Sequence, residues 1–345
     1  MIKLTDIAQA VNLDVSVVSR ALNPRPDRHA VIKEETRQLI QETALKLGYR
    51  PNRQASFLKK GGAATILCFL PDVADRLIAD LMMGISETAC HENFPVNFFF
   101  GNNARDFGKF IRQAERIGHS GIITYPPAKM PPEMRLELKQ YHQRGGNILL
   151  LNVISNTAGI KLEKEYRDIP QLNIDDFYGA QLVARHFLDR GCRRFYHFPE
   201  IHPYRNRLDG FKEPLEAAGF RVEELAGDKL AALKDTKEPA GIFAEHDFLA
   251  YKLLNKMSAC GIRPGDKVLL AGFDDQVSSI RSEPSLTTVH QPTRNEGRLS
   301  VNKLIRMIYG GAEANETLKP HLVVRESSGG NRPDPEHRTD EEIIT

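Results

Sequence analysis

The first fifty residues place apolar side chains at helical spacing in three short stretches. In the first stretch Ile7, Ala8 and Val11 form one stripe, and Thr5 or Asp6 can cap the helix that carries it. The chain is therefore predicted to begin with a short amphipathic helix.

A second helix is predicted over residues 15–22. Asp14 is a natural N-cap, and Val18 and Leu22 face inward at helical spacing. The side chains that remain on the outer face are Val15, Ser16, Ser19 and Arg20. The two helices and the tight turn between them form a helix-turn-helix pattern.

A third helix is predicted over residues 34–47. It ends at Gly48, a residue suited to the left-handed position that follows a helix. The apolar side chains assigned to its inner face are Leu39, Ile40, Ala44 and Leu47. Three helices of this size can bury one small core, so residues 1–50 are expected to form a small all-α unit.

Beyond residue 62 the pattern changes to short apolar runs that alternate with amphipathic stretches. Strands are predicted over 66–70, 96–100, 121–124, 148–152, 195–198, 241–244 and 268–273. Helices are predicted over 77–91, 106–117, 178–190, 208–218, 248–260 and 296–309. Alternation of this kind predicts parallel sheets flanked by helices, and residues 63–328 are long enough for two such α/β lobes.

Charge separates the two parts of the chain. Residues 1–60 carry 11 Lys and Arg against 6 Asp and Glu, a net charge of +5, while the rest carries 36 against 39, a net charge of −3. The whole-chain value of +2 hides this difference. A local basic surplus favours a polyanionic partner such as DNA.

The remaining composition narrows the class of protein. No run of about 18 apolar residues is present to span a bilayer, and the N-terminus lacks the apolar core of a secretory signal, so a cytoplasmic location is expected. Four widely spaced cysteines suggest reduced, mostly buried thiols and no zinc site. We expect no metal and no cofactor.

Residues 51–62 are predicted to form a basic helix with a linker. A helix this short is marginal in water, because its first turn costs more order than its few hydrogen bonds return. It is expected to fold only against a partner helix and DNA, and so to act as a hinge. It carries one exposed apolar wedge.

Polar side chains follow the ends of the predicted strands, where ligands bind in parallel α/β folds. This set suits a ligand with many hydroxyl groups and consists of Asp72, Thr124, Tyr125, Asn152, Glu200, His246, Asp274 and Asp275. Arg207 adds a fork-shaped donor.

The N-terminal motifs resemble those of the lactose-repressor (LacI/GalR) family of bacterial transcription regulators. They are Thr5-Asp6-Ile7-Ala8, Val17-Val18-Ser19-Arg20-Ala21-Leu22-Asn23, Glu35-Thr36-Arg37 and Leu47-Gly48-Tyr49-Arg50-Pro51-Asn52. The resemblance implies that Val15, Ser16 and Arg20 select the operator sequence in the major groove. It also implies that Leu58 enters the minor groove and kinks the duplex.

The residues assigned to DNA contact on this basis are Leu4, Thr5, Val15, Ser16, Val17, Ser19, Arg20, Asn23, Tyr49, Asn52, Arg53, Ala55, Leu58 and Lys59. Arg20 has the alternative of a solvated surface charge. Asn12 stands where the family usually has Gly, and Asn tolerates left-handed geometry, so the turn is expected to survive. The loop over 24–30 is longer than usual, and either touches phosphates or is merely solvated.

The resemblance extends over residues 64–328. Its landmarks are Asn173-Ile174-Asp175-Asp176, His186-Phe187-Leu188-Asp189-Arg190-Gly191, Arg207-Leu208-Asp209-Gly210-Phe211, Ala271-Gly272-Phe273-Asp274-Asp275 and Leu286-Thr287-Thr288-Val289-His290-Gln291. It implies a body like the periplasmic binding proteins, with an effector held between two lobes. The effector-binding residues assigned are Asp72, Thr124, Tyr125, Asn152, Arg207, His246, Phe273 and Asp274.

Several of these residues have a competing interpretation. Arg207 can be a structural salt-bridge partner, and Asp274 a helix cap or surface acid. His246 stands where the family usually has Asn, and Asn152 where Asp is frequent, so the ligand is expected to differ from a standard sugar.

An enzyme is not expected, because the chain contains no glycine-rich phosphate loop and no His-Glu-x-x-His motif. Asp274 and Asp275 are adjacent and point apart, which argues against an acid-base pair. A transport-type sugar-binding protein is the alternative, but it requires export and no DNA-binding head.

Residues 329–345 are acidic, nearly free of apolar side chains and expected to be disordered. They contain no leucine heptads, so a homodimer is expected rather than a tetramer. The sequence thus predicts a homodimeric repressor that binds a pseudo-palindromic operator and responds to a small molecule. A sugar is the expected effector, with a purine-like corepressor as the lesser option.

Overall fold

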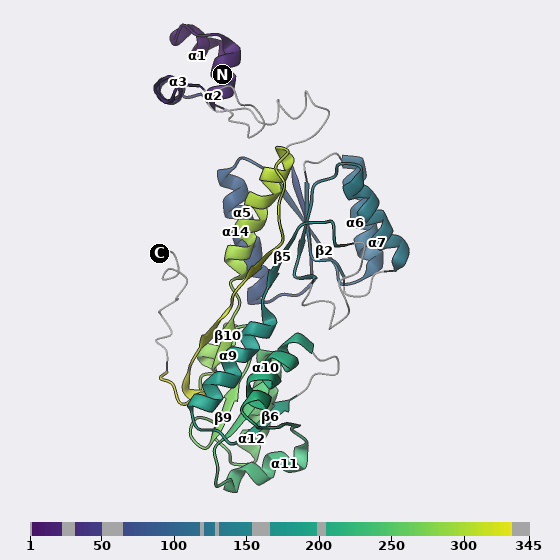
Figure 1. Cartoon of the computed structure of the whole chain (residues 1–345), viewed down its shortest axis with the longest axis vertical. Coiled ribbons are helices and arrows are strands. Elements are labelled where there is room, and N and C mark those ends of the chain that lie inside the picture. Colours follow the sequence, from purple (N-terminus) through teal and green to yellow (C-terminus); the bar gives the residue numbers. More distant parts are fainter. Residues whose placement is uncertain are drawn as a thin grey trace.

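The computed structural model describes residues 2–22, 32–49, 65–117, 121–127, 131–153, 166–198 and 205–332. The N-terminal part consists of three helices, α1 (Leu4–Ala10), α2 (Val15–Leu22) and α3 (Glu34–Lys46), which surround one small core (Figure 1). The fully buried side chains of that core are Ile7, Ala8, Val18, Ala21, Ile40 and Ala44. The predicted three-helix head is therefore confirmed as an architecture.

The turn of the head forms as predicted. Asn12 adopts a positive φ of 51°, and Gly48 one of 69° after α3. Asp14 caps α2, because its Oδ1 accepts a hydrogen bond from the Ser16 amide at 2.7 Å. The cap proposed for α1 is wrong: the helix starts at Leu4, and Asp6 lies in its first turn, where its carboxylate accepts from the Lys3 amide at 2.8 Å.

Two residues assigned to the core of the head are exposed. Leu39 is 52% and Leu47 38% exposed, and Leu45 on the same helix is 82% exposed. Only Ile40 and Ala44 of α3 are buried in the head core. Helical spacing alone therefore overestimates how much of α3 the two short partner helices cover.

The first lobe has a six-stranded parallel sheet in the order β11-β5-β4-β3-β1-β2. Its strands are β1 (Ile66–Leu70), β2 (Val96–Phe100), β3 (Gly121–Thr124), β4 (Ile148–Leu151), β5 (Gln171–Ile174) and β11 (Glu316–Leu318). Its helices are α5 (Arg76–His91), α6 (Ala104–Ile117), α7 (Pro132–Gln143) and α14 (Thr293–Ile308).

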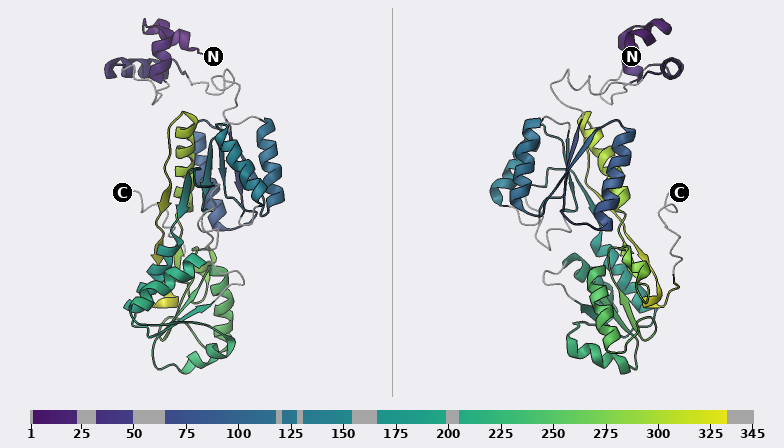
Figure 2. Two further views of the ribbon diagram at one scale, coloured as in Figure 1. Left: turned by 45° about the vertical axis from the view of Figure 1, so that its right-hand side comes forward. Right: turned by 180° about the vertical axis from the view of Figure 1, so that it is seen from behind.

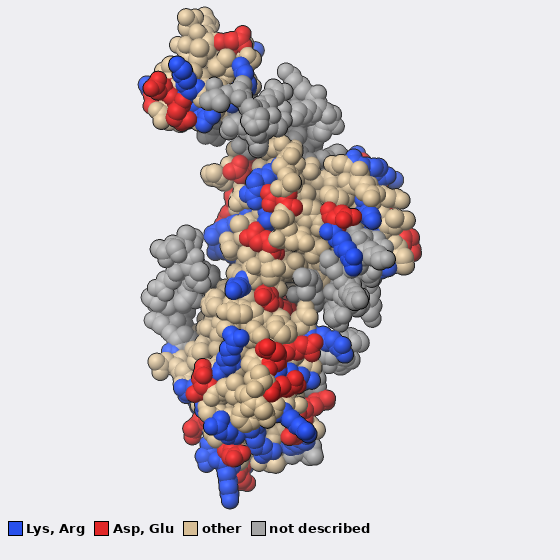
Figure 3. Space-filling view, viewed as in Figure 1, with Lys and Arg blue, Asp and Glu red and all other residues tan. Residues whose placement is uncertain are grey.

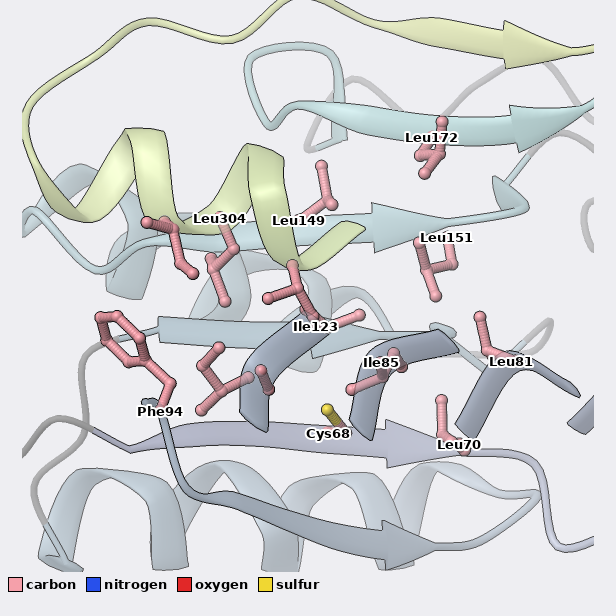
Figure 4. Packing of buried hydrophobic residues seen from close by; sticks show 14 of the residues in the cluster. Cys68, Leu70, Leu81, Ile85, Phe94, Ile123, Leu149, Leu151, Leu172 and Leu304 are labelled. Carbon is pink, nitrogen blue, oxygen red and sulfur yellow. The ribbon is translucent and has the colours of Figure 1, made fainter. Parts of the chain in front are cut away.

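The helices cover the two faces of this sheet in pairs (Figure 1). On one face α5 and α14 pack on the strands through Leu81, Ile85 and Leu304, against Ile123 and Leu149 (Figure 4). Side chains of α6 and α7 form the core on the other face. Because both faces are buried there, the central strands β1, β3 and β4 are nearly continuous apolar runs.

Two glycines set the distance between α5 and α14. A Cβ on Gly84 would lie 2.0 Å from the carbonyl oxygen of Arg294, and one on Gly297 would lie 2.4 Å from that of Leu81. The two backbones can approach this closely only where both side chains are missing. This contact fixes the first turn of α14 relative to the sheet.

The second lobe has a four-stranded parallel sheet in the order β7-β6-β8-β9, and a two-stranded antiparallel ribbon of β10 and β12. Its strands are β6 (Arg194–Phe198), β7 (Val222–Glu224), β8 (Ala240–Ala244), β9 (Val268–Ala271), β10 (Thr288–His290) and β12 (His321–Val323). Its helices are α9 (Asp176–Asp189), α10 (Arg205–Ala217), α11 (Gly227–Ala232), η2 (Leu233–Asp235), α12 (Asp247–Ala259), α13 (Ser278–Arg281) and η3 (Glu326–Ser328).

The described chain passes between the lobes three times: from β5 to α9, from β10 to α14, and from β11 to β12. Figure 2 shows the lobes joined by these strands, with the C-terminal side of the first sheet toward the second lobe. The two-lobed α/β architecture is confirmed. Two predicted strands end early, at Leu151 and Ala271, and the Asn152 and Asp274 that follow have positive φ of 48° and 104°.

Several elements were missed from the sequence, above all α7, β5 and the crossover strands β10, β11 and β12. At the C-terminal end, residues 329–332 are described and are held in place. The Gly329 carbonyl accepts from Arg190 at 3.1 Å, and Arg332 pairs with Glu283 at 2.9 Å. The rest of the expected tail, 333–345, lies outside the described residues.

The prediction of free, mostly buried cysteine thiols is confirmed in part. All four cysteines are free, with Cys68 and Cys192 buried and Cys260 partly buried, whereas Cys90 is exposed. Burial raises the pKa of the Cys192 thiol to about 12, with a smaller opposing effect from neighbouring arginines. No helix within the described residues is long and apolar enough to cross a bilayer.

Candidate functional site

Asn152 lies at the centre of the first lobe's contribution to the site. Its Oδ1 accepts from the Ile174 amide at 2.7 Å, and its Nδ2 donates to Glu296 Oε1 at 2.8 Å and to the Tyr125 hydroxyl. Asn152 follows β4, Tyr125 follows β3, and Glu296 lies in the first turn of α14. Three separate elements thus converge on one amide.

Arg207 lies at the centre of the second lobe's contribution. Its Nε donates to Asp176 Oδ2 at 3.0 Å, and its Nη1 donates to the Glu245 carbonyl at 2.7 Å and lies 3.1 Å from Asp274 Oδ1. The guanidinium also lies 3.9 Å from the centre of the Phe273 ring. Arg207 is therefore a buried salt-bridge partner, as the competing interpretation held, and it lies beside two residues assigned to the effector site.

Asp274 is neither a helix cap nor a surface acid. It is buried, α13 begins only at Ser278, and Asp274 Oδ1 accepts from Gln291 Nε2 at 2.7 Å. Burial raises the pKa of Asp274, and the charge of Arg207 opposes this. Both alternatives to a site role are wrong for this residue.

Asp275 turns away to a separate network. Its carboxylate accepts from His290 at 2.9 Å and pairs with Arg325 at 2.7 Å. Burial acts to raise the pKa of Asp275, but these partners hold it well below its usual value. The two adjacent acids thus point to different partners, as expected.

His246 has a structural contact that the sequence did not suggest. Its Nδ1 accepts from the Leu249 amide at 3.3 Å and caps α12. The neighbouring Asp247 is fully buried and accepts from Thr288 Oγ1, the Gln276 amide and Ser279 Oγ at 2.6–2.7 Å. Burial raises the pKa of Asp247 to about 8, with a further increase from the charge of Asp274.

Asp72 differs from the other residues assigned to the effector site. Its side chain is exposed, and its backbone amide and carbonyl bond the side chain of Asn102 at 3.0 and 3.1 Å. Thr124, by contrast, is fully buried at the end of β3. Glu200 lies outside the described residues.

The two lobes touch through the start of α5. Arg76 donates from Nη2 to the Asp274 carbonyl at 2.7 Å, and its backbone amide donates to Gln276 Oε1 at 3.2 Å. The same guanidinium pairs with Asp80 at 2.6 Å. This contact joins the first lobe to the loop that carries the second lobe's acid.

Sequence reasoning missed Glu296, Asp176 and Arg76. Glu296 has no exposed surface, and burial raises its pKa to about 8, although hydrogen bonds from Tyr125 and Asn152 act in the other direction and the charge of Asp176 adds to the rise. An acid in the first turn of a helix is the ordinary complement of the helix dipole. One feature of the chain could have pointed to Glu296: α14 begins directly after the segment that passes from the second lobe to the first.

Several buried side-chain oxygen atoms lack a hydrogen-bond partner. Within the described residues these include Glu296 Oε2, Thr124 Oγ1 and Asp176 Oδ1. Buried polar groups are normally paired, so each such atom needs an explanation. The same residues include no group of three His, Cys, Asp or Glu arranged to hold a metal.

In the head, the residues assigned to DNA contact divide into two sets. Val15, Ser16 and Thr5 are exposed, whereas Leu4, Val17 and Tyr49 are partly buried and pack against the core of the head. Arg20 is partly buried and donates from Nε to the Ser16 carbonyl at 3.1 Å, and Ser19 is also partly buried. The other assigned residues lie outside the described residues and are Asn23, Asn52, Arg53, Ala55, Leu58 and Lys59.

The basic surplus of the head lies in segments that the structure does not describe. Residues 2–22 and 32–49 hold five basic and five acidic side chains, so the whole excess comes from 23–31 and 50–60. Figure 3 shows charges of both signs mixed over the two lobes on the face presented. On this face the lobes therefore show no large patch of one charge.

The described residues form a two-lobed α/β body with a small helical head. Residues 184–328 match the family model for the periplasmic binding protein-like domain. The chain is 25% identical to the NTD biosynthesis operon regulator NtdR of Bacillus subtilis, covering 94% of this chain and 99% of that protein. It is 24% identical to the repressor CytR of Escherichia coli, covering 94% and 96%.

Solved structures agree with this similarity over nearly the whole chain. The Lac repressor dimer bound to operator and an anti-inducer superposes with a TM-score of 0.64 at 20% identity, covering 95% of this chain and 99% of that one. The complex of the regulator CelR with cellobiose gives 0.63 at 21%, covering 95% and 100%. The resemblance found in the sequence is confirmed: over nearly its whole length the chain is similar to transcription regulators of the LacI/GalR type.

Proposed function

We propose that the chain works as a homodimeric repressor whose DNA affinity is set by a small molecule held between the two lobes. In this scheme residues 1–50 bind DNA, 51–62 act as hinge, 63–328 hold the effector and the dimer contact, and 329–345 form a tail. The effector belongs with sugars and their derivatives, and the protein acts in the cytoplasm.

The observation that carries the proposal is the set of buried polar side chains at the junction of the lobes. Asn152 and Glu296 come from the first lobe, Arg207 and Asp274 from the second, and Arg76 bridges the two. A group of this composition is suited to a small polar ligand, because it combines fixed donors and acceptors away from water. Relatives support the ligand class, since CelR is solved with cellobiose and an Enterococcus faecium LacI-family regulator with ribose.

The coupling to DNA follows from the three strand crossings. A ligand that binds one arrangement of the lobes more tightly than another shifts the population toward it, by no more than its difference in affinity. Arg76 lies on this path because it joins α5 to the Asp274 loop. A change in lobe closure would then alter the spacing of two hinge segments in a dimer.

Selection of duplexes from a random pool by the purified protein, with and without a panel of metabolites, tests the function. We expect this selection to recover pseudo-palindromic sequences, and their recovery should depend on one class of metabolite. The protein should also be retained on a heparin column, and this retention should fall steeply as the salt concentration rises. Leu58→Ala should weaken operator binding and leave ligand binding intact, whereas Arg207→Ala should abolish the response to ligand and keep DNA binding. Recovery of no DNA sequence, or unchanged behaviour of both variants, would refute the proposal.

A further inference from the structure

The first lobe buries a carboxyl group that has no basic partner. Glu296 is fully buried, and no ion pair joins it to a Lys, Arg or His within the part of the chain that the structure describes. Its only partners there are the Asn152 amide and the Tyr125 hydroxyl, both uncharged. A buried acid is costly unless a charge or several donors compensate it, so this arrangement calls for another group.

Two acids near Asn152 each keep one unpaired oxygen atom. Glu296 Oε2 and Asp176 Oδ1 are buried without a hydrogen-bond partner among the described residues. Asn152 bonds Glu296 through its Nδ2 and the Ile174 amide through its Oδ1, and Asp176 follows Ile174 by two residues, at the start of α9. The charge of Asp176 also raises the pKa of Glu296. Two carboxylate oxygens require a ligand group that donates hydrogen bonds.

The second lobe does not supply that group. The guanidinium of Arg207 is engaged by Asp176 Oδ2, Asp274 Oδ1 and the Glu245 carbonyl. That of Arg76 is engaged by Asp80 and the Asp274 carbonyl. Both guanidinium groups are therefore engaged by acids already present, three carboxylates against two cations, so neither compensates Glu296.

Three classes of ligand group can face such a position. An anion would be repelled by Asp176 and Glu296. A neutral hydroxyl donates one hydrogen bond and gives Glu296 no reason to ionise. A protonated amine offers several donors and one positive charge, so it can bond both unpaired carboxylate oxygens and stabilise the ionised form of Glu296.

We propose that the effector of this protein carries a protonated amine, and that Glu296 is the residue that selects it. The ligand class is an aminated polyol such as an amino sugar, with the ammonium group at Glu296 Oε2 and Asp176 Oδ1. Hydroxyl groups of the same ligand face Asn152 and the Arg207 side. This inference rests on the proposed function only in placing the effector at the junction of the lobes.

A proton is released when such a ligand binds at neutral pH. In the free protein burial holds the pKa of Glu296 at about 8, so the carboxyl group is mostly protonated at pH 7. An ammonium group beside it favours the ionised form and lowers that pKa. The protein therefore loses one proton from Glu296 to the buffer as the amine enters.

The test is calorimetry of the full-length protein with matched pairs of probes: D-glucosamine with D-glucose, and D-galactosamine with D-galactose. In at least one pair the amino compound is expected to bind about tenfold to a hundredfold more tightly, the range for a hydrogen bond to a charged group. At pH 7 its binding heat should change with the ionisation enthalpy of the buffer, because a proton is released.

Glu296→Gln is the decisive variant, because glutamine keeps the shape and the acceptor for Asn152 but cannot ionise. It is expected to abolish the preference within the pair and the proton release, while affinity for the neutral sugar stays within about twofold, the scatter expected for an interaction that is not touched. Glu87→Gln is the matched control: Glu87 lies on the outer side of the same helix pair and bonds Arg294 and Arg298. It should keep both properties.

Thermal melts report whether the variants are folded. The proposal is overturned if no amino compound binds more tightly than its neutral match, complete absence of binding included, or if Glu296→Gln retains the preference. Its failure can be told from failure of the proposed function. A neutral sugar that binds and alters operator affinity would leave the function intact and refute the amine. An amino sugar that binds through Glu296 without any effect on DNA binding would support the amine and refute the proposed function.

Discussion

The two halves of the site bury acids in opposite ways. In the second lobe, Asp176 and Asp274 are both paired with Arg207. In the first lobe, Glu296 is surrounded by uncharged groups from Asn152 and Tyr125. A matched group holds a structure together, whereas an unmatched one is a cost that a ligand can relieve, so the two halves have different roles even though both consist of buried polar side chains.

The largest effect is expected from breaking the matched half. Arg207→Ala leaves two carboxylates buried without their cation, and removal of one partner from a buried ion pair costs about 3–5 kcal/mol. The free energy of unfolding, measured by urea denaturation at pH 7, should fall by that amount. Arg207→Lys keeps the charge but loses the fork of donors, so it should recover part of the loss. A stability equal to that of the parent would show that the pairing contributes little.

Removal of the acid from the unmatched half, Glu296, should raise the free energy of unfolding, and the size of this gain should depend on pH. Glu296 has a folded pKa near 8 against 4.5 for an ordinary glutamate. The folded state therefore holds the proton more tightly, and its contribution to stability, complete below pH 4.5, is lost as the pH rises to 8. At about 1.4 kcal/mol per pKa unit, a difference of about 3.5 between the two pKa values corresponds to a loss on the order of 5 kcal/mol.

Glu296→Gln removes this dependence, so the variant should gain stability relative to the parent between pH 5 and pH 8. The measurement is the difference in free energy of unfolding across that range. Asp247, whose pKa is also raised to about 8, is common to both proteins and cancels in the difference. A constant difference from pH 5 to pH 8 would mean that Glu296 is ionised in the folded protein at pH 5.

How far the sequence predicted the two halves depends on the physical origin of each signal. Strands buried on both faces, such as β1 and β3, are continuous apolar runs, and their predicted bounds are those observed. β5 was missed because Gln171 and Asn173 interrupt its apolar pattern. The structure buries both, and Gln171 donates to the Tyr166 carbonyl at 3.1 Å.

The site itself was predictable only where it follows from local rules. Asn152 and Asp274 could be assigned to the candidate site because ligand-binding residues follow the ends of parallel strands. Glu296 was not, since its burial results from the packing of α14 on α5, between residues about two hundred positions apart in the chain. The exposed Leu39 and Leu47 show the same limit, because helical periodicity identifies an apolar face but not what covers it.

A glycine contact on the first lobe tests whether the position of Glu296 is set by the helix pair. Gly84→Ala places a Cβ about 2.0 Å from the Arg294 carbonyl, so α14 must move away from α5. Overpacking of this kind costs about 1–3 kcal/mol. Ligand affinity should fall with stability, while contacts of Arg207 in the second lobe remain.

Gly108→Ala is the control for that substitution. Its added Cβ would meet the end of the Met134 side chain, which can move, and alanine favours the helix. Stability is expected to be unchanged or slightly higher, measured by the midpoint of thermal unfolding. If Gly84→Ala behaves like this control, the two helices are free to separate without cost and the close contact does not position Glu296.

The smallest effect should come from Tyr125→Phe, and it separates hydrogen bonding from charge in the unmatched half. The phenol bonds Asn152 and lies against Glu296, so its removal takes one buried hydrogen bond, about 1 kcal/mol, from the folded state at pH 7. Because the hydrogen bond from Tyr125 acts to lower the pKa of Glu296, the variant should hold its proton to a higher pH than the parent. A carbon-13 titration of the Glu296 carboxyl would measure this shift. A lower pKa in the variant would mean that the phenol stabilises the neutral acid instead, and Glu296 would then face its ligand as a donor rather than as an acceptor.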